Sequence, residues 1–258
     1  MIELKQLCHH YGLQPTLHDV NLVVKPGELA VVVGPNGIGK STLLGLIAGV
    51  LTPWEGEVWV AGKRRRGSVD DELEIRRQSV YLPAMPFLPL AMTGREFLIA
   101  VGRIYEVPWD RLFSQVDRLF SLFQLADRSE AAISSYSTGQ QKKLSLCAAL
   151  LPETPILILD EPFSGGLDPA GLMVLKRLLK RRVQEKQHCV ILSSPVPEIV
   201  EEIADRIVIL KQGTVAASES LERLRQKTGI PGTLGQILEQ MLYPEVQQQI
   251  DTYFSETV

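Results

Sequence analysis

Cysteine is scarce in this sequence, and its three cysteines form neither a disulfide framework nor a metal-binding pair. Cys8, Cys147 and Cys189 lie far apart, and two of them stand in apolar runs. Isolated cysteines in apolar runs are typical of small buried thiols, which fits a reducing cytosol. The four histidines and the cysteines show no spacing suited to zinc.

Long hydrophobic runs and an excess of charge are also missing. A membrane helix needs roughly 18 uninterrupted apolar residues, and the longest candidate, residues 88–105, contains Arg95, Glu96 and Arg103. We expect no signal peptide, because a strand pattern begins at Ile2. The net charge of −3 gives no electrostatic argument for a nucleic-acid partner, and we expect none. Any membrane part of the system is therefore expected on another chain.

Short apolar runs and helical patterns alternate along most of the chain. Continuous apolar runs at 29–33, 156–159, 190–192 and 207–210 predict strands buried on both faces, as in parallel sheets. Patterns at 2–7, 17–24 and 57–60 predict further strands, which we assign to a small antiparallel β part. We predict an α/β fold with a mainly parallel sheet. Its parts are a core from 1–84 and 151–228, a helical subdomain at 85–150 and a short helical extension at 229–258.

A phosphate-loop pattern, GxxxxGK[ST], stands between a predicted strand and a helical run. It comprises Gly34, Pro35, Asn36, Gly37, Ile38, Gly39, Lys40, Ser41 and Thr42. Glycines let backbone N–H groups surround a phosphate, and the helix adds its positive N-terminus. Lys40 is expected to reach the β- and γ-phosphates and Ser41 to bind Mg²⁺. The alternative is a glycine-rich turn without a ligand, which this context disfavours.

Two carboxylates follow the apolar run 156–159. Asp160 is placed to hold Mg²⁺, and Glu161 is the candidate base that polarises an attacking water. Taken alone, two acids after a strand are more often a helix cap or a solvated turn. Their presence beside a phosphate loop in one α/β chain favours nucleotide hydrolysis, with Glu161 and Lys40 as the candidate catalytic residues.

Together these motifs resemble the ATP-binding subunits of ABC transporters, over residues 1–225. Residues 136–140 resemble the signature motif LSGGQ of that family, with Thr138 in place of a glycine. The resemblance implies that Ser137 and Gly139 contact the γ-phosphate of ATP bound to a second ATP-binding subunit, in a homo- or heterodimer. Gln140 belongs to the same candidate nucleotide-binding segment.

Two further residues match positions in that family. The stretch ending in Asp168-Pro169 resembles the D-loop, which couples the two nucleotide sites across the dimer interface. Asp168 is also a predicted helix N-cap, and both roles can hold together. Tyr11 matches the aromatic residue that stacks on adenine; the alternative is a surface tyrosine beside a turn.

Two other positions depart from the pattern of the family. Ala84 stands where a glutamine usually contacts Mg²⁺ and the attacking water and senses the membrane subunit, and Gln78 precedes the strand instead. Pro195 stands where a histidine usually contacts the γ-phosphate, and proline has no side-chain donor. The residues that nucleotide binding requires are all expected to be present. Hydrolysis is expected to be slow, or to take place only in a heterodimer.

The resemblance implies a peripheral ATPase at the cytoplasmic face of the cell membrane, using ATP and Mg²⁺ to drive a separate integral membrane transporter subunit. The helical subdomain and the region near Ala84 would receive a cytoplasmic helix of that partner. Gly45, Ala48 and the short tail after residue 229 are more similar to exporter subunits than to importers.

Two alternatives stay open. One is a regulatory nucleotide-binding subunit paired with an active sister ATPase. The other is an ABC ATPase of DNA repair, translation or cofactor assembly, although those usually carry two cassettes, long coiled coils or strongly basic surfaces. The densest basic run, residues 63–66, is interpreted as a solvated turn or as a contact with anionic lipid or an acidic partner.

Overall fold

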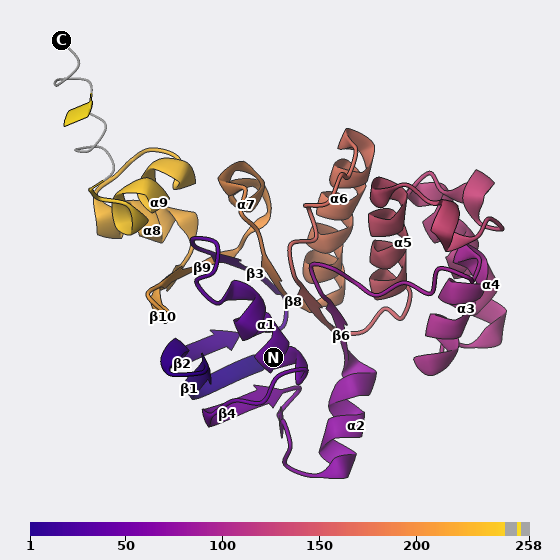
Figure 1. The fold of residues 1–258 in the computed structure, drawn as a ribbon, viewed down its shortest axis with the longest axis horizontal. Coiled ribbons are helices and arrows are strands. Elements are labelled where there is room, and N and C mark those ends of the chain that lie inside the picture. The colour runs from indigo at the N-terminus through magenta and orange to yellow at the C-terminus, as the bar shows by residue number, and fades with distance from the viewer. Residues whose placement is uncertain (246–251, 254–258) are drawn as a thin grey trace.

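The larger of two β-sheets forms the centre of the molecule (Figure 1). The computed structural model describes residues 1–245 and 252–253. The six strands of this sheet run in the order β10-β9-β3-β8-β7-β6. They are β3 (Glu28–Val33), β6 (Ser79–Leu82), β7 (Ile156–Leu159), β8 (Cys189–Ser193), β9 (Arg206–Lys211) and β10 (Thr214–Glu219). All neighbouring pairs are parallel except β9 and β10, so the predicted α/β class with a mainly parallel sheet is confirmed.

A second, antiparallel sheet lies beside the first, as expected for the N-terminal β part. Its order is β2-β1-β4-β5, with β1 (Ile2–Tyr11), β2 (Gln14–Val24), β4 (Glu55–Val60) and β5 (Lys63–Arg64). Helix α1 (Lys40–Ala48) packs against strands of both sheets (Figure 1). Leu43, Leu44, Leu46 and Ile47 are all buried, which explains why this helix shows no polar face in the sequence.

The other face of the larger sheet is covered by helices. These are α5 (Thr138–Leu150), α6 (Pro169–Lys186) and α7 (Pro197–Ile203), while α2 (Val69–Gln78) leads into β6. Helices α3 (Gly94–Ile104) and α4 (Trp109–Leu122) lie with α5 at one end of the molecule, and α8 (Leu221–Thr228) and α9 (Leu234–Leu242) lie at the other (Figure 1). The helices expected between residues 92 and 125 are therefore present.

The basic run at 63–66 is only partly a solvated turn. Arg65 is buried, its Nε donates to the main-chain oxygen of Ile47 at 3.0 Å, and its Nη1 lies 3.1 Å from a carboxylate oxygen of Glu72. Lys63 pairs with Asp71 at 2.9 Å. The interpretation as a solvated turn is wrong for Arg65, because its guanidinium joins the end of α1 to α2.

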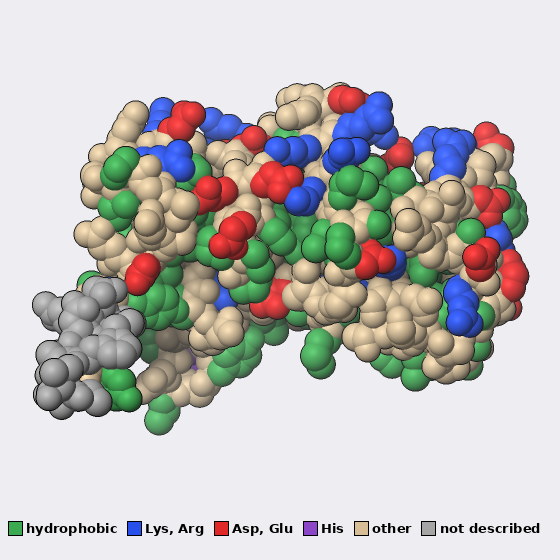
Figure 2. Space-filling view, turned by 90° about the horizontal axis from the view of Figure 1, so that it is seen from above, with side chains coloured by type: hydrophobic (Ala, Val, Ile, Leu, Met, Phe, Trp, Pro, Cys, Tyr) green, Lys and Arg blue, Asp and Glu red, His purple; other side chains and the backbone are tan. Residues whose placement is uncertain are grey.

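The surface carries both signs of charge. On the face shown in Figure 2, Lys and Arg side chains alternate with Asp and Glu side chains and form no continuous basic area. Within the described ranges, none of the helices combines the length and the apolar character that a membrane crossing requires.

Candidate functional site

Four loops that carry predicted site residues leave the same edge of the larger sheet. The phosphate loop follows β3, Asp160 and Glu161 follow β7, Pro195 lies beyond the end of β8, and Ala84 lies beyond the end of β6. These strands are parallel, so their carboxyl ends meet at one edge, which is where α/β proteins bind ligands.

The phosphate loop has the backbone that a phosphate cradle requires. Gly34 has φ 153°, and a Cβ at this position would lie 2.7 Å from the main-chain oxygen of Leu210. The N-cap of α1 is Gly39, which offers no capping side chain, so no side chain of the cap competes with a phosphate for the first N–H groups of the helix. Lys40 is buried, and its Nζ donates to the main-chain oxygens of Gly34 at 2.9 Å and Pro35 at 3.0 Å.

The charge of Lys40 is influenced by both carboxylates after β7. Burial lowers the pKa of the Lys40 ammonium, and the negative charges of Glu161 and Asp160 partly oppose that shift. The fold therefore brings the lysine of the phosphate loop and the two acids into one electrostatic environment.

Asp160 is held by a serine that the sequence did not single out. The carboxylate is buried, and its Oδ1 accepts a hydrogen bond from Ser193 Oγ at 2.5 Å. Ser193 Oγ in turn accepts from the N–H of Glu161 at 2.9 Å. Asp160 and the hydroxyl of Ser41, in the first turn of α1, are oxygen donors of the type that Mg²⁺ prefers, so this donor set fits that ion.

The backbone of Glu161 is held in an unusual conformation. Its φ is 43°, in the left-handed region that non-glycine residues rarely adopt. Its main-chain oxygen accepts from Lys142 Nζ at 3.0 Å, from Ser164 Oγ at 2.9 Å and from the N–H of Ser164 at 3.2 Å. Lys142 is itself buried, and burial lowers the pKa of its ammonium.

The signature segment forms the start of α5. Ser137 is the N-cap, with its Oγ accepting from the N–H of Gln140 at 3.3 Å, while Gln140 Oε1 accepts from the N–H of Ser137 at 2.9 Å. Gln140 thus has a structural role as the second half of a capping box. Gly139 is packed against the D-loop: a Cβ there would lie 2.5 Å from the main-chain oxygen of Gly166.

Asp168 is the N-cap of α6, as predicted. Its Oδ1 accepts from the N–H of Gly171 at 2.8 Å, and its Oδ2 lies 2.7 Å from Nζ of the buried Lys143. The hydrogen bond from Lys143 holds the pKa of this carboxyl below its usual range. The pairing of Asp168 with Lys143 was not predicted.

Tyr11 is the last residue of β1 and pairs with Gln14 across the hairpin. Its ring is 62% exposed and meets the ring of His9 edge-on, with centroids 4.9 Å apart. Tyr11 is thus an exposed aromatic residue at the end of a strand. That it stacks on adenine stays a prediction.

Comparison with known proteins identifies the family. The family model described as "ABC transporter" matches residues 17–164, which is more than half of the chain. The chain belongs to the ABC transporter family of ATP-binding proteins. It is 30% identical to an uncharacterised ABC transporter ATP-binding protein, YxlF of Bacillus subtilis, over 88% of this chain and 73% of that protein. It is also 30% identical to the Nod factor export ATP-binding protein I of Rhizobium meliloti, over 82% of this chain and 62% of that protein.

Solved structures agree with this assignment. An ATP-binding subunit of an ABC transporter superposes with a TM-score of 0.85 at 31% identity, over 92% of this chain and 97% of that one. A dimeric ATP-binding cassette in a post-hydrolysis state, bound to ADP and Pi, superposes with a TM-score of 0.77 at 26% identity, over 86% of this chain and 99% of that one. The expected family and fold are therefore confirmed for this ABC transporter ATP-binding chain.

Proposed function

We propose that this chain binds and hydrolyses Mg-ATP at the edge of the sheet that carries the phosphate loop, and that it thereby drives export through a separate membrane subunit. One observation carries the proposal. The buried side chains of Lys40 and Asp160 lie with Glu161 at the edge of the sheet where the parallel strands end. A buried cation beside two acids, behind a cradle of backbone N–H groups, suits a nucleotide phosphate and its metal ion.

Each residue of the site has a proposed role. Lys40 exchanges its two main-chain acceptors for the β- and γ-phosphates, and Ser41 with Asp160 holds Mg²⁺, which neutralises phosphate charge when bound. Glu161 orients and polarises the attacking water. Tyr11 stacks on adenine, which its exposed ring allows. The remaining phosphate-loop residues are Gly34, Pro35, Asn36, Gly37, Ile38, Gly39 and Thr42, whose backbone surrounds the phosphates.

The second half of each nucleotide site is proposed to come from a partner ATP-binding subunit, identical or different. Ser137, Gly139 and Gln140 of one subunit would face the γ-phosphate held by the other, and Asp168 would lie at the interface. The N-terminus of α5 suits an anion because of its helix dipole. The dimeric relative bound to ADP and Pi supports this arrangement.

Slow hydrolysis is part of the proposal. Ala84 follows β6 and Pro195 follows β8, the two strands on either side of β7 at the nucleotide-binding edge. Neither side chain can donate a hydrogen bond to water or phosphate. These two residues also favour a second candidate function, that of a regulatory nucleotide-binding subunit beside an active sister ATPase.

The contact with the membrane subunit is proposed at an apolar pocket next to Ala84. The pocket has a volume of about 220 Å³, and its wall includes Pro83, Phe87, Phe97 and Tyr105. Phe87 is 92% exposed and Met85 is 90% exposed, and large exposed apolar side chains that lie close together often mark an interaction site. An apolar cytoplasmic segment of the transporter would fill this pocket, and the chain would lie peripherally at the cytoplasmic face of the cell membrane.

Export is proposed as the direction of transport for two reasons. One relative is named for Nod factor export, and Gly45 and Ala48 are more similar to exporter subunits than to importers. The division into a core at 1–84 and 151–228, a helical subdomain at 85–150 and an extension at 229–258 also stays a proposal. Part of that extension lies outside the described residues.

The binding proposal is tested with the variants Lys40→Ala and Lys25→Ala. Lys25 is an exposed lysine at a turn, so its replacement serves as the matched control. Titration with a fluorescent ATP analogue in the presence of Mg²⁺ should show strongly weakened binding for Lys40→Ala alone. Equal affinity of wild type and Lys40→Ala would contradict the role of Lys40.

The transport proposal is tested by affinity purification of the tagged chain from detergent-solubilised membranes. An integral membrane protein should copurify, and the variant Phe87→Asp should reduce its recovery. Copurification of ribosomes or DNA instead would favour the non-transport alternative.

A further inference from the structure

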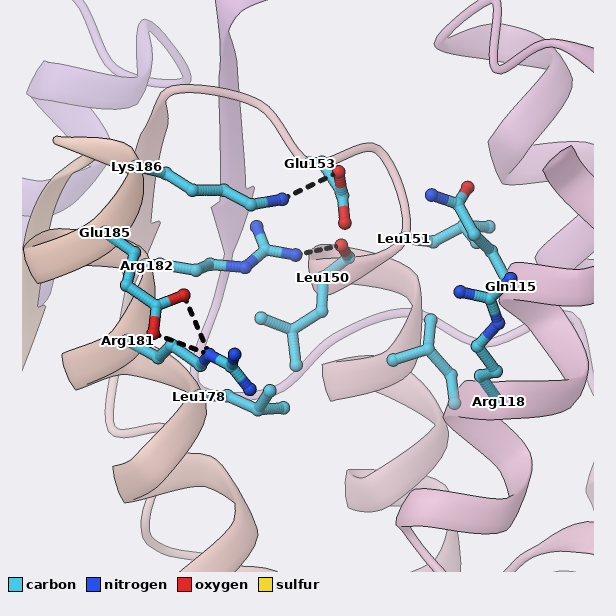
Figure 3. A pocket seen from close by; sticks show the side chains of 11 residues that line it. Gln115, Arg118, Leu150, Leu151, Glu153, Leu178, Arg181, Arg182, Glu185 and Lys186 are labelled. Atoms are coloured by element: carbon cyan, nitrogen blue, oxygen red, sulfur yellow. Dashed lines mark hydrogen bonds and ion pairs between the residues drawn. The ribbon is translucent and has the colours of Figure 1, made fainter.

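A pocket of about 320 Å³ lies at the opposite edge of the larger sheet from the phosphate loop. It is bounded by α4, by the segment that links α5 to β7, and by the last turns of α6 (Figure 3). That segment enters the amino end of a parallel strand, whereas the phosphate loop leaves a carboxyl end. The pocket is therefore separate from the candidate nucleotide site.

The charges around this pocket do not balance. Four cations line it, Arg118, Arg181, Arg182 and Lys186, against two carboxylates. Arg181 Nε lies 2.8 Å from a carboxylate oxygen of Glu185, and Lys186 Nζ lies 3.0 Å from one of Glu153. In the part of the chain that the structure describes, Arg118 and Arg182 have no carboxylate within 4.0 Å.

Two polar atoms of the lining are buried without a hydrogen-bond partner among the described residues. One is Nη1 of Arg182, whose Nη2 donates to the main-chain oxygen of Leu150 at 2.5 Å. The other is Oε1 of Gln115, on the facing helix. Buried donors and acceptors are normally satisfied by protein, water or ligand, so these two groups leave one donor and one acceptor to be satisfied beside the pocket. Burial also lowers the pKa of the Arg182 guanidinium.

The cations of this pocket come from two sides. Figure 3 shows Arg182 and Lys186 extending from α6 on one side, with Arg118 and Gln115 on the helix opposite. A planar carboxylate satisfies one guanidinium fork, whereas a tetrahedral phosphate presents oxygens toward donors on both sides. Leu119 and Leu178 form an apolar part of the pocket wall, which suits the organic group of a phosphate ester.

We propose that this pocket binds a small organic phosphate, held by Arg118 from α4 and by Arg182 from α6. The organic part lies against Leu119 and Leu178. Because its two principal donors come from α4 and α6, the bound phosphate joins the proposed helical subdomain to the core. This inference does not depend on the proposed hydrolysis.

The test uses the full chain saturated with Mg-ADP, so that the phosphate loop is already occupied, and phenyl phosphate as the probe. Calorimetric titration should show binding to the wild type. The variant Arg118→Gln, on an exposed side chain, should bind at least about tenfold more weakly, the usual effect of losing a charge-assisted hydrogen bond. Arg177→Gln, an exposed arginine of α6 outside the pocket, is the matched control and should bind like the wild type.

Three outcomes would overturn the proposal. No binding of phenyl phosphate to the Mg-ADP-loaded chain excludes the site, and equal affinity for Arg118→Gln excludes the assigned donor. Benzoate binding as tightly as phenyl phosphate would overturn the choice of phosphate over carboxylate. In support, phenyl phosphate should bind Lys40→Ala as well as wild type, and more tightly than inorganic phosphate does, because of the apolar wall.

Discussion

The ammonium group of Lys142 lies 3.0 Å from the main-chain oxygen of Glu161. This contact joins the first turns of α5, which carry the signature segment, to the residue that follows Asp160. On the other side of Glu161, its N–H donates to Ser193 Oγ at 2.9 Å. The carboxylate proposed as the base is thus attached to a backbone fixed from both sides, in a conformation with φ 43° that needs such support.

Replacing Lys142 with methionine should slow hydrolysis and leave ATP binding nearly unchanged. The variant removes the bond to Glu161 but no group that faces the phosphate loop in the proposed site. A small displacement of a positioned catalytic group costs about tenfold to a hundredfold in rate. Phosphate release at saturating ATP measures the rate, and Lys25→Met is the surface control. An unchanged rate would show that Lys142 has no positioning role.

ATP should promote pairing of the chain, since the signature segment is proposed to complete a site only on a second subunit. Glu161→Gln should trap that pair, because the amide cannot accept a proton from water but occupies the same volume. Light scattering with and without Mg-ATP gives the mass. A Glu161→Gln protein that hydrolyses ATP like the wild type would remove Glu161 from its proposed role.

Restoring the two departing residues should accelerate hydrolysis. Ala84→Gln supplies a side chain for the metal and water, and Pro195→His supplies a donor for the γ-phosphate. One positioned donor toward developing charge is worth about 3 kcal/mol, or roughly a hundredfold in rate. The two gains need not add, so the double variant is assayed with both singles. Fast wild-type turnover with no gain in the double variant would mean that other residues fill these roles.

The pair of Asp168 and Lys143 should stabilise the fold only above acidic pH. The pKa of Asp168 is lowered in the folded chain, chiefly by Lys143. Its contribution is therefore complete above the unfolded pKa of about 4 and is lost as pH falls through the lower folded value. Asp168→Asn keeps a good N-cap and removes the charge, so it should cost up to about 1 kcal/mol at pH 7, because Asp168 is partly exposed.

Urea unfolding of wild type and Asp168→Asn from pH 7 to pH 3 checks this expectation, since the difference between them should shrink in acid. Asp168→Ala also removes the cap and should cost about 1 kcal/mol more at every pH. A difference between wild type and Asp168→Asn that stays constant with pH would contradict the assigned pKa direction.

The buried strands were predictable because their sequences are continuously apolar, as in β3 and β7. Strand β10 was not predicted, since it lies at the sheet edge, none of its residues is buried, and they include the small Ala216 and Ala217. Helix α2 was also missed, because Ile75 is its one buried residue. Its signals were local instead: Ser68 caps it and acidic residues fill its first turn.

The phosphate loop and the two acids after β7 were found because each motif is contiguous in sequence. The contacts that hold the backbone of Glu161 were not predicted, because Lys142 and Ser193 lie 19 and 32 residues away from it in sequence. A polar residue at the end of an apolar strand, like Ser193, or a lysine within an apolar helix, like Lys142, is the available signal. Neither signal identifies the partner, which depends on how the strands are ordered.

The close approach of Gly139 to Gly166 limits which sequences this fold can accept. Any side chain at residue 139 would collide with the main-chain oxygen of Gly166, 2.5 Å from the position of its Cβ, so the two loops can diverge only together. Residue 138 is exposed in the single chain and is not part of this contact, so the side chain of threonine is accommodated there. Packing inside the single chain therefore restricts residue 139 of the signature segment even before any contact with the proposed partner subunit is made.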